Sequence, residues 1–63
     1  MRTFSYFIKD DRYSVPTLQF AVVPDEARAL ELARRQLFSS PHHLAIEVHE
    51  GGRELYRQER PGV

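Results

Sequence analysis

The sequence predicts an α+β domain with the order ββαββ, in which four strands form a mainly antiparallel sheet and one helix packs on one of its faces. Two stretches near the start of the 63-residue chain alternate apolar and polar residues, as strands do. A helical pattern follows, and two further alternating stretches close the chain. Because neither a half-apolar sheet nor an amphipathic helix can hide its apolar side alone, the two should pack together.

The first two expected strands, residues 3–9 and 17–23, form a hairpin joined by a polar turn that begins at Asp10. Pro16 is expected at the start of the second strand or at a sheet edge, because it has no N–H to donate. The larger apolar residues of both strands alternate and are expected to face the core. These residues are Phe4, Tyr6, Ile8, Leu18, Phe20 and Val22.

The predicted helix begins at Pro24-Asp25-Glu26, with proline at the first helical position and two carboxylates that favour the helix dipole. Its apolar residues gather on one broad face, and Leu30, Ala33 and Leu37 are expected to cover the sheet. Leu32 points away from this face. The segment Ser39-Ser40-Pro41 ends the helix.

The third expected strand alternates Leu44, Ile46 and Val48 with polar or small residues. Gly51-Gly52 provides a tight turn, since glycine adopts positive φ without steric cost. Residues 53–58 form a fourth strand with Leu55 or Tyr56 facing the core. We therefore expect a single domain over residues 1–63, with an ordered core of about 3–58 and a flexible tail at 59–63.

The strand order follows from the position of the helix between the two hairpins. If the first and third strands are the central pair, the sheet is antiparallel with the order 2-1-3-4. The order 1-2-3-4, with one parallel pair, is the alternative. Either sheet leaves one face in water. The residues expected there are Ser5, Phe7, Lys9, Thr17, Gln19, Ala21, Ala45, Glu47 and His49.

Composition narrows the classes of function. Nine basic and nine acidic residues give a formal net charge of zero, whereas nucleic-acid-binding proteins usually carry a basic excess. The chain has no cysteine, which excludes disulfides and thiolate chemistry and favours a reducing, cytoplasmic location. The first residues lack the apolar core of a signal peptide, and no run approaches the roughly 18 apolar residues of a membrane span.

Several short segments resemble a group of short, uncharacterised bacterial proteins found especially in alphaproteobacteria. The segments are Tyr6-Phe7-Ile8-Lys9-Asp10, Asp25-Glu26-Ala27, Ala33-Arg34 and Glu47-Val48-His49-Glu50-Gly51-Gly52-Arg53. His49 stands where that group commonly has tryptophan, and the connection from Ser39 to His43 is longer. The resemblance implies a bacterial, soluble, single-domain protein and transfers no activity or functional residue.

Metal binding and catalysis are not expected. His42 and His43 are neighbours in a loop, so their side chains rarely converge. Glu47 and His49 share a strand face but lack further ligands. No serine lies in a nucleophile-elbow motif. A chain of this length also has little room to enclose a pocket of roughly 300 Å³. The sequence therefore predicts no catalytic residue, cofactor or metal.

Protein contact, including formation of a homodimer, is the function we expect. Apolar side chains left outside the core mark interaction sites. The candidates for this surface are Phe7, Leu32, Phe38 and Tyr56. The alternative is weak binding of single-stranded nucleic acid, with Phe7 and Tyr56 stacking on bases and Arg53 and Arg57 near the phosphates. Interleaved glutamates weigh against that alternative.

Overall fold

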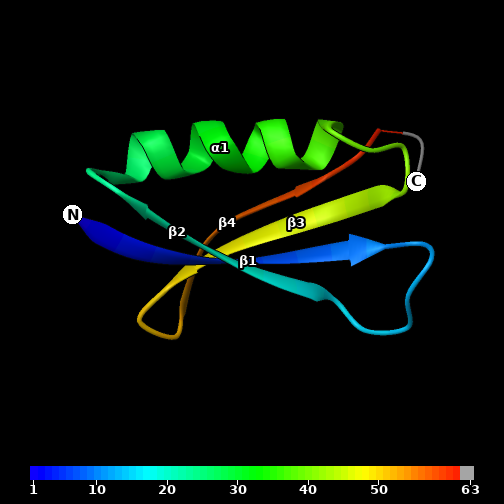
Figure 1. Ribbon diagram of the computed structural model, residues 1–63, viewed down its shortest axis with the longest axis horizontal. Helices are drawn as coiled ribbons and strands as arrows, with labels where there is room; N and C mark the ends of the chain where they lie inside the picture. The colour runs from blue at the N-terminus through cyan, green and yellow to red at the C-terminus, as the bar shows by residue number, and fades with distance from the viewer. Residues whose placement is uncertain (62–63) are drawn as a thin grey trace.

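The computed structural model describes residues 1–61 and confirms the predicted α+β architecture. The four strands form one sheet with the order β2-β1-β3-β4, and each neighbouring pair is antiparallel. The order 1-2-3-4 is therefore wrong. The elements are β1 (Arg2–Asp10), β2 (Thr17–Val23), α1 (Glu26–Phe38), β3 (His43–Glu50) and β4 (Arg53–Glu59) (Figure 1).

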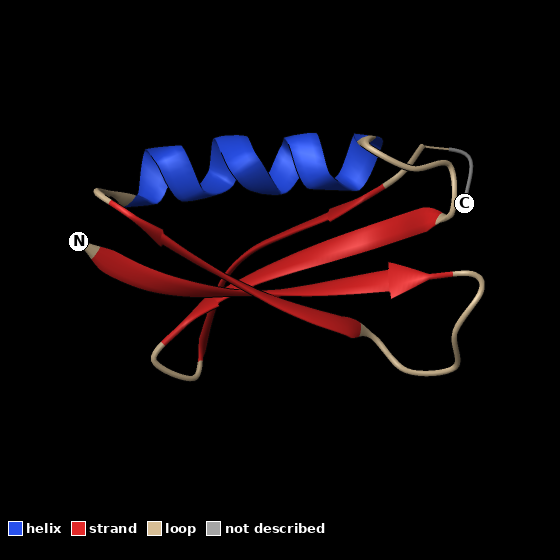
Figure 2. Cartoon of the chain, viewed as in Figure 1, coloured by secondary structure: helices blue, strands red, loops and turns tan. Residues whose placement is uncertain are grey.

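The helix lies along one side of the sheet, and the core is the layer between them (Figure 2). The small side chains of Ala29 and Ala33 let the helix approach the strands closely, and Leu37 fills the space near its end. The hydroxyl of Tyr6 donates a hydrogen bond of 2.8 Å to the carbonyl oxygen of Ala29, which satisfies this buried polar group. The fully or nearly buried residues are Phe4, Tyr6, Ile8, Val23, Ala29, Ala33, Leu37, Ile46 and Val48.

Strand β2 presents the opposite face from the one predicted. Phe4 lies opposite Ala21 in the β1–β2 ladder, and Ser5 lies opposite Phe20. Because directly paired residues share a sheet face, Ala21 lies on the helix side with Phe4. The prediction that Leu18, Phe20 and Val22 belong to the core is therefore wrong. So is the placement of Thr17, Gln19 and Ala21 on the uncovered face.

Two shifts in strand register change the surroundings of three further residues. The β1–β3 pairing shifts after Lys9, and Leu44 is only half-buried, outside the core cluster where it was expected. The β3–β4 pairing shifts between Val48 and His49 and leaves Leu55 without a direct partner. Both Leu55 and Tyr56 then pack against the core, although only one of them was expected to do so.

The helix begins at Glu26, two residues later than its proline suggested. Asp25 is the N-cap, and its carboxylate accepts a hydrogen bond of 2.9 Å from the Arg28 backbone N–H. Pro24 precedes the cap and is not the first helical residue. With 13 residues, α1 is shorter than the roughly 20 needed to cross a bilayer, and no helix within residues 1–61 meets that requirement.

The turn between β3 and β4 has the predicted glycine geometry. Gly51 and Gly52 have φ angles of 60° and 78°. Side chains other than glycine adopt such angles only with strain, so two successive glycines suit this position. The tight turn brings β4 back alongside β3 and makes β4 the second edge of the sheet.

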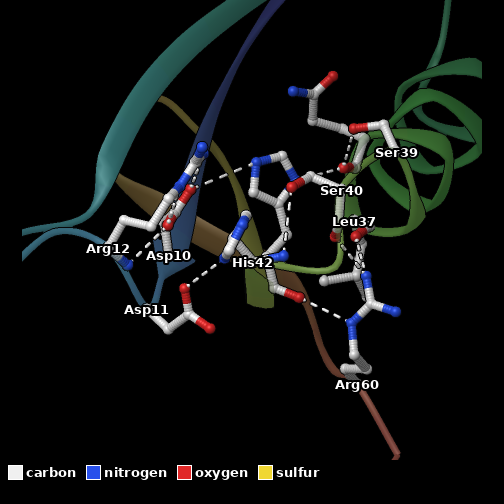
Figure 3. A network of polar contacts seen from close by, with 10 residues as sticks. Asp10, Asp11, Arg12, Leu37, Ser39, Ser40, His42 and Arg60 are labelled. Atoms are coloured by element: carbon white, nitrogen blue, oxygen red, sulfur yellow. Dashed lines mark hydrogen bonds and ion pairs between the residues drawn. The ribbon is translucent and has the colours of Figure 1, made fainter.

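Arg60 links the end of β4 to the C-terminal end of the helix by hydrogen bonds (Figure 3). Its guanidinium donates hydrogen bonds of 2.8, 2.7 and 2.8 Å to the carbonyl oxygens of Leu37, Ser40 and His43. Its backbone N–H donates a hydrogen bond of 2.8 Å to the Leu44 carbonyl. A cation at this position also favours the negative end of the helix dipole.

These contacts alter the expected boundary between the core and the tail. Glu59 belongs to β4, so the strand runs one residue beyond the expected end at residue 58. Arg60 is anchored by its backbone and its side chain. The remainder of the expected tail includes residues 62–63, which lie outside the described part of the chain.

Asp10 is a buried carboxylate at the end of β1, with 4% of its surface exposed. Its oxygens accept three hydrogen bonds from Arg12, at 2.8 Å from the backbone N–H and at 3.0 and 2.7 Å from the guanidinium (Figure 3). His43 Nε2 lies 3.7 Å from Asp10 Oδ2, while His43 Nδ1 donates to the Gln36 carbonyl at 2.7 Å. The Arg12 hydrogen bonds hold the pKa of Asp10 well below its usual value.

Replacing Arg60 by glutamine should lower the free energy of unfolding by about 1–3 kcal/mol, because three carbonyl oxygens lose a charged donor. Urea denaturation followed by circular dichroism measures the change. The matched control is Arg34→Gln on the exposed side of α1, for which a change within about 0.5 kcal/mol is expected. Equal effects of the two substitutions would contradict the role given to Arg60.

The contribution of Asp10 to stability should depend on pH. Because the pKa of Asp10 is lowered on folding, its contribution is fully present above the ordinary carboxyl value of 3.8 and is lost as pH falls further. Asp10→Asn should therefore destabilise the protein near neutral pH, and the gap to the unsubstituted protein should narrow in acid. Denaturation curves across this range measure that gap. The exposed neighbour Asp11 supplies the control Asp11→Asn, with a smaller effect. A gap that does not vary with pH contradicts the assignment.

Candidate interaction surface

The side of the sheet away from the helix carries an apolar strip along the edge strand β2. Leu18, Phe20 and Val22 occupy alternate positions of the strand and are 48%, 66% and 60% exposed. Residues two apart on a strand share one face, so the three side chains stand in a row. We call these three residues the β2 patch. Exposed apolar residues gathered in this way are typical of contact surfaces.

Phe7 continues the apolar surface from β2 onto β1. It lies opposite Leu18 in the β1–β2 ladder and opposite Glu47 in the β1–β3 ladder. Its ring meets the ring of His49 edge to face, with centroids 4.8 Å apart and planes at 68°. These neighbours leave Phe7 only half-exposed, so it forms the inner margin of the β2 patch.

The other three residues predicted for the interaction surface lie elsewhere. Leu32 is half-buried and packs against the core. Phe38 is 50% exposed on α1, where the Arg60 guanidinium lies 5.1 Å from the centre of its ring. Tyr56 is paired with Val48, which places it on the helix side of the sheet. Phe7 and Tyr56 are thus on opposite sides, and the two-ring stacking platform expected for nucleic acid is not formed.

A charged cluster on β3 and β4 forms the polar half of the uncovered face. His49 Nε2 lies 3.0 Å from a Glu47 carboxylate oxygen. Arg57 Nη2 lies 3.4 Å from Glu47 and 3.1 Å from Glu54. The hydrogen bond with His49 and the nearby Arg57 lower the pKa of Glu47. Charged groups of both signs therefore lie in contact within this cluster.

The same cluster has three groups of a kind that bind metal ions. One ligand atom each from Glu47, His49 and Glu54 lies within 4.8 Å of the other two. The sequence predicted only that Glu47 and His49 share a strand face. Glu54 joins them because β3 pairs with β4. The guanidinium of Arg57 already contacts both carboxylates. A metal ion would have to displace that cation, so the geometry is that of an ion-pair network.

The three histidines have different partners. His42 Nδ1 lies 2.9 Å from an Asp11 carboxylate oxygen. His43 begins β3 and bonds to the helix carbonyl of Gln36, while His49 contacts Glu47. Within residues 1–61 they do not converge on a common point.

A hollow of about 360 Å³ lies at one end of the uncovered face. Its walls include Phe7, Lys9, Arg57, Glu59 and the loop residues 13–16. The hollow is partly open to solvent, so the expectation that so short a chain has little room to enclose a pocket of roughly 300 Å³ stays a prediction. The β1–β2 loop forms this space by lying beside the sheet, and it adds exposed apolar side chains to those of the strand.

A signal for the true face of β2 is present in the sequence next to the helix. Only Pro24 and Asp25 separate Val23 from α1, so the chain must already be turning toward the helix at Val23. Val23 is buried, and strand alternation then assigns Ala21 to the same side. Choosing the face with the larger apolar residues missed this signal.

Comparison of the chain with protein-family models, with curated proteins and with solved structures gives no match. The ββαββ pattern of the resemblance described above is present in the structure, but the comparisons identify no family. The properties of the surface therefore have to be inferred from its own residues.

The assignment of the β2 faces can be tested with the same substitution at two adjacent positions. Val23→Thr should lower the free energy of unfolding by about 1–3 kcal/mol, because it places a hydroxyl group in the core. Val22→Thr should change it by no more than about 0.5 kcal/mol, because that side chain is exposed. Threonine suits strands as valine does, so strand propensity contributes little to either change. Chemical denaturation at low protein concentration measures both. A larger effect at Val22 would reverse the assignment.

Proposed function

We propose that this protein is a non-catalytic interaction module that associates with a second copy of itself through the β2 patch. The observation that supports this most directly is the row formed by Leu18, Phe20 and Val22 on an edge strand. An edge strand offers unpaired backbone groups, and apolar side chains beside them favour contact with another chain.

Size and charge favour association with a like chain. A domain of about 60 residues buries only about 60% of the surface of its unfolded chain, so a partner adds stability that the small core lacks. The formal net charge is zero, and long-range repulsion between copies is accordingly weak.

Binding of single-stranded nucleic acid is less well supported. The exposed ring of Phe20 could stack on a base, but β2 contains no charged residue to contact a phosphate. Arg57, one of the two arginines expected to contact phosphates, already forms ion pairs with Glu47 and Glu54. We propose in addition a bacterial origin and a cytoplasmic location, on the basis of the sequence resemblance and the absence of cysteine.

Sedimentation of the protein over a range of concentrations tests self-association. The mean mass should rise from that of one chain toward that of two. Phe20→Ser should raise the dissociation constant at least about tenfold, because it removes the largest side chain of the patch. Phe38→Ser is the matched control, since that ring is also exposed but lies on the helix. A mass of one chain at every concentration would rule out the proposed function.

A further inference from the structure

We propose that two copies join edge to edge, with their β2 strands paired antiparallel and Phe20 opposite Phe20 across a two-fold axis. This inference rests on the proposed function and specifies its geometry. The two four-stranded sheets become one continuous sheet. Both helices then lie on the same side, because a two-fold axis perpendicular to a sheet does not exchange its faces.

The two edges of the sheet differ in how they meet another strand. Four of the seven residues of β4 are charged, namely Arg53, Glu54, Arg57 and Glu59. Charged side chains on an edge strand discourage pairing with another chain. The seven residues of β2 include none. The structure therefore protects one edge of the sheet and leaves the other suited to pairing.

Two prolines define which residues of β2 can pair. Pro16 comes directly before the strand and Pro24 directly after it. Neither has an N–H to donate, so a new ladder is confined to Thr17–Val23. The midpoint of this range is Phe20, and antiparallel strands overlap fully when their midpoints face each other.

This register is self-complementary on both faces. On the uncovered side Phe20 meets its own counterpart, and each Leu18 meets the Val22 of the other copy. On the helix side each Gln19 meets the Ala21 of the other copy. No charged side chain is brought opposite another, and apolar or aromatic cross-strand pairs stabilise antiparallel sheets.

Stacking of the two uncovered faces is the other way to cover the β2 patch, and the charges disfavour it. The stacked sheets would enclose Lys9, Glu47 and Arg57, all of which lie on that face. Removing charged groups from water is unfavourable unless every one of them is paired in good geometry. Edge-to-edge pairing leaves the charged cluster in contact with solvent.

Disulfide cross-linking distinguishes the two arrangements, and the chain has no cysteine of its own to interfere. Gln19→Cys and Ala21→Cys chains are mixed and exposed to oxidised glutathione. In the proposed register these positions face each other at a Cα separation of about 4.5–5.5 Å, within the range that a disulfide spans. Each variant alone places its two cysteines diagonally across the ladder and should link poorly. Stacked faces leave both positions on the outer, helix-covered sides.

Hydrogen exchange of the unsubstituted protein gives a second, independent measurement. Raising the protein concentration should slow exchange of those β2 amides that point away from β1, and should leave the outer amides of β4 unchanged. A disulfide formed in the mixture, together with this protection, supports edge pairing. If the mass doubles without the cross-link and without protection in β2, edge pairing is wrong and the proposed self-association stands. If the mass stays at one chain, both are wrong.

Discussion

The register between β1 and β2 is the constraint on which the surface of this protein depends. Phe4 lies opposite Ala21 and Ser5 opposite Phe20. A shift by one residue would exchange the two faces of β2 and bring Phe20 toward the core. The observed register instead packs the smaller side chain, Ala21, against the core and leaves the larger one, Phe20, in water. The three side chains of the β2 patch are therefore exposed because the core contains none of them.

The helix explains why the smaller residues of β2 suffice on the covered side. Its buried stripe is formed by Ala29, Ala33 and Leu37, and it packs chiefly over β3, with less contact to β1 and β2. An edge strand at the margin of this layer needs little side-chain volume to meet the helix. Val23 provides the main buried contact of β2, and Ala21 packs beside it. Larger side chains on β2 are then available for other contacts.

Polar contacts join the strands to the C-terminal end of the helix. They come from residues that local sequence patterns do not single out. Arg60 joins the end of β4 to the carbonyl groups that end the helix. Asp10 and Arg12 form a second group of polar contacts (Figure 3), and His43 Nε2 lies 3.7 Å from Asp10 Oδ2. Buried charged groups are stable only with such partners. These contacts draw the last residues of β4 into the domain and hold the β1–β2 loop in position beside the uncovered face.

Periodicity and glycine placement are local properties, and the sequence by itself determined the four strands, the helix and the tight turn at Gly51-Gly52. The tertiary structure decided between the two strand orders that the sequence left open. Which face of β2 is buried was decided only in the tertiary structure. Both sets of alternate residues in Thr17–Val23 contain apolar side chains, so alternation alone does not choose between them. The choice comes from pairing with β1 and from the short connection to the helix, which link residues distant in sequence. The same holds for Arg60 and for the cluster around Arg57, whose partners meet only when the strands and the helix have assembled.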